Sequence, residues 1–137
     1  MLTLEQAAAT MQELVKATQG MSVGEMPSPN QIFDIYGRLV GLYAKIGEEM
    51  CRKFNAKERA YLHRKIEAAK VYQKGRYDKL TSGDAQQSSL LAVGEEIDKE
   101  IETATAYEQY RTLRKSIEAA IDFARSIQSF ISRSEHA

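Results

Sequence analysis

Apolar residues recur at alternating spacings of three and four along two long stretches of this chain. The first stretch consists of Ile32, Ile35, Leu39, Leu42 and Ile46, and the second of Tyr110, Leu113, Ile117, Ala120, Ala124, Ile127 and Ile131. This spacing places apolar side chains along one stripe of an α-helix that packs against another helix. The 137 residues include only 8 glycines and 2 prolines, too few for a turn-rich β-sandwich or barrel. We therefore predict an all-α chain.

Each stripe is predicted to extend toward the middle of the chain. The first continues through Leu62, Ile66, Ala69 and Leu80, and the second is preceded by Leu90, Val93, Ile97, Ile101 and Ala104. Because the step from Ala104 to Tyr110 is six residues rather than seven, we expect the helix to be locally overwound there.

Capping residues and breaks in the periodicity divide the chain into segments. Thr3 and Gln6 have the spacing of a capping box, and Gly20 is a typical helix terminator. Ser28 and Pro29 are typical of the first positions of a helix. We predict a single helical domain with an N-terminal helix over 1–19, a linker over 20–29, a basic helix over 30–80, a polar turn over 81–89 and a long C-terminal helix over 90–133.

The two long helices are predicted to form an antiparallel helical hairpin, to which the short N-terminal helix is added. One hairpin buries a single stripe on each helix and makes a weak monomer, so we expect a homo-oligomeric helical bundle, such as a ring. Gly37, Gly41 and Gly47 interrupt the first stretch and indicate close approach of another helix. The residues predicted to lie between copies are Ile32, Leu39, Ile46, Leu113, Ile117, Ile121, Ile127 and Ile131.

Charge is segregated along the chain, although 19 basic residues balance 19 acidic ones. Between residues 52 and 79, ten cations face three carboxylates, which gives a net charge of +7, whereas residues 81–110 carry a net charge of −6. The local field of each segment, rather than the overall charge, therefore indicates its partners. Two interpretations fit this segregation. In the first the basic helix neutralises the acidic helix, and in the second it binds a polyanion.

The reactive side chains argue against several function classes. Cys51 is the only cysteine, so an intrachain disulfide is excluded and a cytoplasmic location is expected. With two histidines besides Cys51, a structural zinc site is not expected. The serines have no predicted base partner, phosphate-binding glycine loops are absent, and no apolar run is long enough for a membrane span. We expect no enzymatic activity, no metal, no cofactor and no membrane partner.

Tyrosines are interleaved with the cations of the basic helix. Because cations neutralise phosphates and aromatic rings stack on bases, this combination is typical of single-stranded nucleic acid binding. Lys65, Arg76 and Lys79 share one helix face with Tyr72 and Ala69. The residues predicted to contact a strand are Lys57, Arg64, Lys65, Lys70, Tyr72, Lys74, Arg76, Tyr77 and Lys79. In the alternative interpretation the tyrosines are buried and the cations are merely solvated.

A likeness to a known family begins with the run Ile66-Glu67-Ala68 and continues through Lys74-Gly75-Arg76-Tyr77-Asp78 to Ser82-Gly83. These runs resemble the middle of the UvsY family of phage recombination mediators, in which Ile-Glu-Ala leads to Lys-Ala-Arg-Leu-Asp and a Ser-Gly turn. Gly75 and Tyr77 replace the alanine and the leucine of that motif.

The resemblance implies a non-catalytic, ring-like homo-oligomer that binds single-stranded DNA. Such a protein helps to load a RecA-like recombinase onto strands that are coated by a single-strand-binding protein. The resemblance also implies that Lys74 and Arg76 contact DNA, and that Asp78 orients Arg76.

Two other functions fit the sequence. One is a helical protein–protein interaction module, such as a phage inhibitor of a host defence or a virion assembly component, which uses the acidic face over 95–102 or the groove at Gly37 and Gly41. The other is an oligomeric binder of small anions or nucleotides, in which arginines converge between subunits. Intramolecular pairing of most of the ten cations would favour the interaction module.

Overall fold

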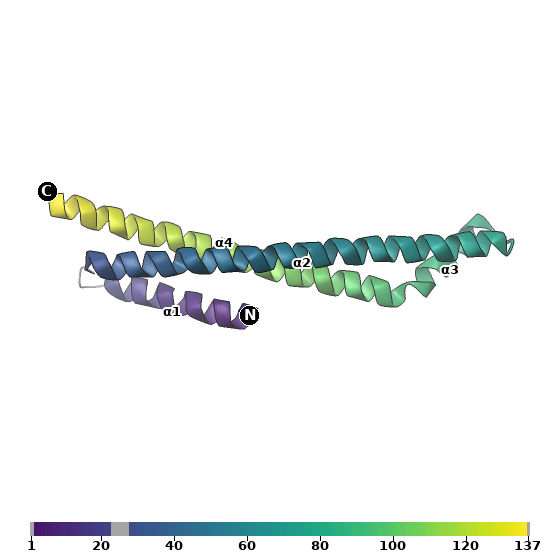
Figure 1. The fold of residues 1–137 in the computed structure, drawn as a ribbon, viewed down its shortest axis with the longest axis horizontal. Coiled ribbons are helices and arrows are strands. Elements are labelled where there is room, and N and C mark those ends of the chain that lie inside the picture. Colours follow the sequence, from purple (N-terminus) through teal and green to yellow (C-terminus); the bar gives the residue numbers. More distant parts are fainter. Residues whose placement is uncertain (1, 23–27, 137) are drawn as a thin grey trace. The chain divides into compact units, whose positions relative to one another are not determined.

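The computed structural model describes residues 2–22 and 28–136, and its ordered elements over these ranges are α-helices. Four helices follow one another: α1 (Leu4–Ser22), α2 (Pro29–Tyr77), α3 (Ser82–Ala92) and α4 (Gly94–His136) (Figure 1). The all-α prediction is therefore confirmed. Helix α1 runs three residues beyond its predicted end at residue 19, and residues 23–27 of the predicted linker lie outside the described residues.

The first two helices begin at the predicted capping residues. At the start of α1, the Gln6 amide donates to the Thr3 hydroxyl (3.1 Å) and the Thr3 amide donates back to the Gln6 side chain (3.0 Å). Ser28 and Gln31 make the same reciprocal pair at the start of α2, at 3.3 and 3.1 Å. Each pair satisfies two backbone groups that would otherwise lack a partner within the helix.

The polar turn predicted over 81–89 is wrong, because most of this segment belongs to helix α3. Thr81 caps α3 by accepting a hydrogen bond from the Asp84 amide (3.1 Å). The buried face of α3 consists of small residues, Ala85 and Ser89, and the Ser89 hydroxyl donates to the Ala68 carbonyl of α2 (2.9 Å). A helix that buries only such small side chains lacks the apolar stripe from which helices are recognised in a sequence.

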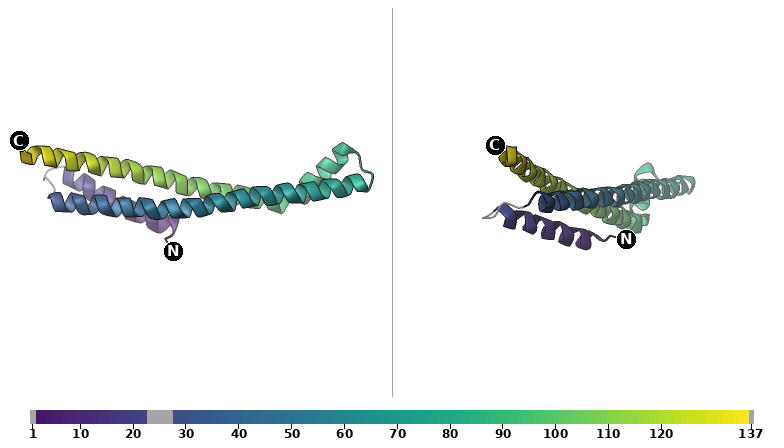
Figure 2. Two further views of the ribbon diagram at one scale, coloured as in Figure 1. Left: turned by 45° about the horizontal axis from the view of Figure 1, so that its top comes forward. Right: turned by 60° about the vertical axis from the view of Figure 1, so that its left-hand side comes forward.

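The chain divides into two compact units. The first takes in the described residues of 1–50 and 109–137, where α1 lies along the N-terminal part of α2 (Figure 2). In this unit α2 and α4 run antiparallel, since Tyr36 contacts Arg125 while Tyr43 contacts Arg114. Ala7 and Leu14 of α1 belong to the same buried cluster as the stripes of α2 and α4. The unit is thus a three-helix bundle.

This core contains the residues that were predicted to lie between copies. Ile32, Leu39, Ile46, Leu113, Ile117, Ile121 and Ile131 are buried within one chain, and Ile127 is half-buried against them. A two-helix hairpin alone would leave part of these side chains exposed, but α1 packs over them in this unit. These side chains are therefore occupied by intrachain packing and are not available to a second copy.

The three glycines of α2 in the first unit have different surroundings. A methyl group at Gly47 would lie 2.9 Å from the Arg114 guanidinium, which stacks on the Tyr43 ring at 4.0 Å. Gly47 therefore fits the expectation of close approach, although a side chain rather than a helix backbone fills the space. Gly37 and Gly41 have nothing of the described chain within 4 Å of such a methyl group, so no helix of this chain packs there.

The second unit, residues 51–108, is formed by the remaining parts of α2 and α4 together with α3. Its buried apolar side chains are only Ala85 and Val93 among the described residues. Leu62 and Ile66, which were predicted to continue the packed stripe, are 55% and 53% exposed, and Ala69 and Leu80 are exposed as well. The α2 side that faces α4 is instead lined by half-buried Ala56, Ala60 and Arg64.

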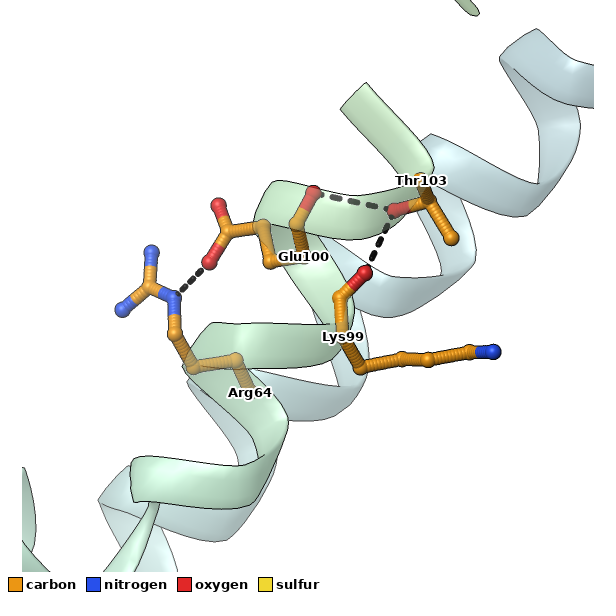
Figure 3. A network of polar contacts seen from close by, with 4 residues as sticks. All are labelled: Arg64, Lys99, Glu100 and Thr103. Carbon is orange, nitrogen blue, oxygen red and sulfur yellow. Dashed lines mark hydrogen bonds and ion pairs between the residues drawn. The ribbon is translucent and has the colours of Figure 1, made fainter. Parts of the chain in front are cut away.

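The stripe of α4 passes through Thr103 rather than through Ile101 and Ala104. Ile101 is 60% exposed, whereas Thr103 is buried. Its hydroxyl donates to the carbonyls of Lys99 (2.9 Å) and Glu100 (3.0 Å), which makes burial of this polar side chain tolerable (Figure 3). Since Thr103 and Tyr110 are seven residues apart, the heptad spacing is intact, and the overwinding expected from a six-residue step has no basis.

Candidate nucleic-acid interface

The second unit carries opposite charges on its two long helices. Its part of α2, residues 51–77, holds nine lysines and arginines and two glutamates. Its part of α4, residues 94–108, holds Lys99 and six carboxylates. Arg64 donates from its Nε to the Glu100 carboxylate and so joins the two helices (Figure 3). Lys70 instead pairs with Glu67 of its own helix at 3.2 Å.

Other cations of α2 are held by aromatic rings. Lys57 lies over the Tyr107 ring at 5.0 Å, and Lys65 lies over the Tyr61 ring at 4.8 Å. Tyr107 also contacts Phe54, with the ring centroids 5.6 Å apart. A cation–π contact supplies no counter-charge, so the aromatic rings hold these two ammonium groups without neutralising them. Arg52 and Lys53 also have interaction partners.

Lys74–Lys79, hereafter the basic tip, is held by backbone hydrogen bonds at the end of α2. The Leu80 amide donates to the Gly75 carbonyl (2.9 Å) and the Lys79 amide donates to the Arg76 carbonyl (3.1 Å), the two bonds of a Schellman motif. Lys79 has a φ of 66°, the left-handed conformation in which glycine is the usual residue. A methyl group on Gly75 would lie 3.2 Å from the Ala85 side chain, so a larger residue at this position would require α3 to shift by a few tenths of an ångström.

The basic tip presents charges and one aromatic ring to solvent. Tyr77 is 88% exposed. Within the described residues, Lys74 and Lys79 have no hydrogen bond or ion pair from their side chains, whereas Arg76 donates to the Leu80 carbonyl (3.1 Å). Asp78 was expected to orient Arg76, but no contact between the two side chains is found in the described part of the chain. The Leu80 carbonyl holds the Arg76 guanidinium instead. In the sequence, two residues with unpaired ammonium groups therefore flank a residue with an exposed ring.

Tyr72 differs from Tyr77 in its surroundings. It is half-buried, and its hydroxyl lies 3.1 Å from the Ser82 hydroxyl at the start of α3. It thus supports the connection between α2 and α3. Of the two tyrosines predicted to stack on bases, Tyr77 alone has its ring exposed.

A groove of about 500 Å³ lies beside the basic side of α2 in the second unit. Its residues are Lys53, Ala56, Arg59, Ala60, His63, Lys99, Glu102, Thr103 and Ala106. Arg59 has no hydrogen bond or ion pair within the described part of the chain, and three alanines keep the groove open. An anion in this groove would meet Arg59 and His63 from α2, whereas on the α4 side Lys99 is paired with the Glu102 carboxylate (4.0 Å), which also lines the groove.

The groove and the tip lie along one side of α2. This side, hereafter the basic flank, consists of Arg52, Arg59, His63, Lys70 and Lys74, all of them exposed. Their spacings of seven, four, seven and four residues are close to two turns and one turn of an α-helix, so the five side chains lie on one side. Lys70 and Lys74 were predicted from the sequence as contacts, whereas Arg52, Arg59 and His63 were not, although this spacing places all five on one side of the helix. Three residues of the predicted face, Lys65, Tyr72 and Arg76, have intramolecular contacts. On the basic flank, Lys70 pairs with Glu67 and Arg52 also has a partner.

Over residues 2–22 and 28–136 there is no group of three or more His, Cys, Asp or Glu side chains that could hold a metal ion. Nor does any helix within these ranges have the length and hydropathy of a membrane span.

Comparison with protein-family models, with curated proteins and with solved structures finds no match for this chain. The function therefore has to be inferred from the residues themselves.

Proposed function

We propose that this protein binds single-stranded DNA with its basic tip and basic flank. The observation that carries the proposal is the 88% exposed ring of Tyr77, with the unpaired ammonium groups of Lys74 and Lys79 three residues before it and two residues after it in the sequence. A single strand offers a phosphate backbone to the lysines and an unpaired base to the ring, and stacking of this kind contributes about 1–3 kcal/mol per base. A solvated helix face needs no exposed tyrosine.

The basic flank extends this contact along α2. Arg52 and Lys74 are 22 residues apart, which corresponds to roughly 33 Å of helix at about 1.5 Å per residue. The groove beside Arg59 and His63 gives a strand room to lie along α2. Contacts of this type neutralise phosphates without reading the base sequence, so binding is expected to be insensitive to sequence.

The biological role that we propose is that of a non-catalytic recombination mediator. It rests on the resemblance of residues 57–83 to the UvsY family, whose short motif overlaps the basic tip. The partners would be a RecA-like recombinase and a single-strand-binding protein. This role predicts faster recombinase filament formation on strands coated by the single-strand-binding protein, and unchanged filament formation would contradict it.

DNA binding is tested by fluorescence anisotropy of a labelled single-stranded oligonucleotide at several salt concentrations. Each phosphate contact contributes about 0.7 to the slope of log affinity against log salt, so Lys74→Ala/Lys79→Ala should reduce the slope by about 1.4. The control is Lys45→Ala/Lys115→Ala, which removes the same charge from exposed positions of the first unit. Equal losses in both variants, or no binding of the unaltered protein at low salt, would refute the proposal.

A helical protein–protein interaction module is the second candidate function. Large apolar side chains on the surface of the second unit favour it, among them Leu62, Ile66 and Leu91. The two candidates differ in one outcome, since an interaction module does not bind DNA even at low salt.

A further inference from the structure

The second unit exposes apolar side chains on the outer sides of both its long helices. Leu62 and Ile66 are each two residues from Arg64, which contacts α4. Two residues correspond to roughly 200° around a helix, so both side chains lie on the side of α2 that faces away from α4. They are 55% and 53% exposed, and Ala69 continues the same side.

Helix α4 has a matching side. Ile101 is two residues from the buried Thr103, so it lies on the side of α4 that faces away from α2. It is 60% exposed. Asp98, one helical turn away, is exposed as well, and Glu95 and Glu102 are exposed carboxylates of the same segment.

The two outer sides differ in charge. Arg59, Lys65 and Lys70 lie three or four residues from Leu62 or Ile66 and outnumber Glu58 there, whereas Asp98 is the charged residue at that spacing from Ile101. Two copies that met through the same α2 side would bring like charges together and repel each other. The α2 side of one copy is complementary to the α4 side of another, in apolar contact and in charge.

We propose that this chain assembles head to tail, with Leu62 and Ile66 of one copy packed against Ile101 of the next. The two outer sides point away from each other within a unit, so each copy can contact two neighbours at once. Such a contact is heterologous, and it closes into a ring or continues as a filament. The proposal replaces the contact predicted through residues that are buried in the first unit. It does not rest on DNA binding.

The interface is tested with two variants that each damage one side. Ile66→Asp removes the apolar contact of the α2 side, and Ile101→Asp removes that of the α4 side. Both positions are exposed within a helix, so each variant should keep its helical circular dichroism. Phe33→Asp is the control, because Phe33 is also exposed on α2 but belongs to the first unit. The masses are measured by light scattering in the absence of DNA.

The unaltered protein and Phe33→Asp should form the same oligomer, whereas Ile66→Asp and Ile101→Asp should each be monomeric. An equal mixture of the two damaged variants retains one intact α2 side and one intact α4 side, so it should form dimers of about twice 15.4 kDa. A monomeric unaltered protein would overturn the proposal. So would a mixture that stays monomeric, or dissociation by Ile66→Asp alone, which indicates contact between two α2 sides.

Discussion

Lys79 is held in a backbone conformation that costs stability, and its replacement by glycine should separate stability from binding. A residue with a side chain pays roughly 1–2 kcal/mol in the left-handed helical conformation, and glycine adopts it at little cost. Because the Schellman bonds of Lys79 and Leu80 need no side chain at residue 79, Lys79→Gly should keep them. We expect the free energy of unfolding to rise by about 1 kcal/mol.

The assay is urea denaturation followed by circular dichroism, with Lys79→Ala as the matched control. Lys79→Ala removes the same ammonium group but keeps a β-carbon in the left-handed conformation, so its stability should stay close to that of the unaltered protein. A rise of about 1 kcal/mol corresponds to roughly 2–8 °C in Tm, depending on how many residues unfold together. Both variants should lose one phosphate contact, which lowers the salt slope of single-strand binding by about 0.7.

Two results would refute this reasoning. Equal stability of Lys79→Gly and Lys79→Ala would show that the backbone at residue 79 is not strained. A stabilised Lys79→Gly that binds DNA with an unchanged salt slope would show that the ammonium group does not contact phosphate.

Three further substitutions test the packing. Gly41→Ala should stabilise the protein by about 1 kcal/mol in urea denaturation, because the site is open and alanine is the better helix former. Gly47→Ala should stabilise it less, because the added methyl group displaces Arg114 from the Tyr43 ring. Ile117→Ala should cost about 2–5 kcal/mol at every protein concentration, whereas a cost that varies with concentration would place Ile117 between copies. Thr81→Ala should cost about 1 kcal/mol and speed hydrogen exchange within α3, and unchanged exchange would exclude the cap.

Helix starts and the first-unit core could be predicted because their signals are local. A capping box needs only Thr3 and Gln6 at the right spacing, and a heptad stripe such as Ile32 to Ile46 identifies its own buried side. The helix against which each stripe packs is not indicated by the local spacing. The contribution of Ala7 from α1 could not be read from the spacing of the isoleucines, so intrachain packing was mistaken for contact between copies.

The second unit was harder to predict because its helices have no single apolar side. Leu62 and Ile66 have helical spacing, yet α2 turns its alanines toward α4 and leaves the larger side chains outside. The charge count and the basic-tip residues were visible in the sequence. The exposure of Tyr77 and the contact of Tyr72 with Ser82 were not, because they depend on how α3 folds back against α2.

Photochemical crosslinking tests most directly whether a single strand lies on the basic tip. An oligonucleotide that carries iodinated uracil is irradiated with the protein, and the crosslinked residue is identified by mass spectrometry. We predict that Tyr77 is the main crosslinked residue and that Tyr77→Ala removes this adduct without unfolding the protein, because the ring is 88% exposed. A bound strand whose crosslinks lie only in the first unit, within residues 28–50 or 109–133, would contradict the account.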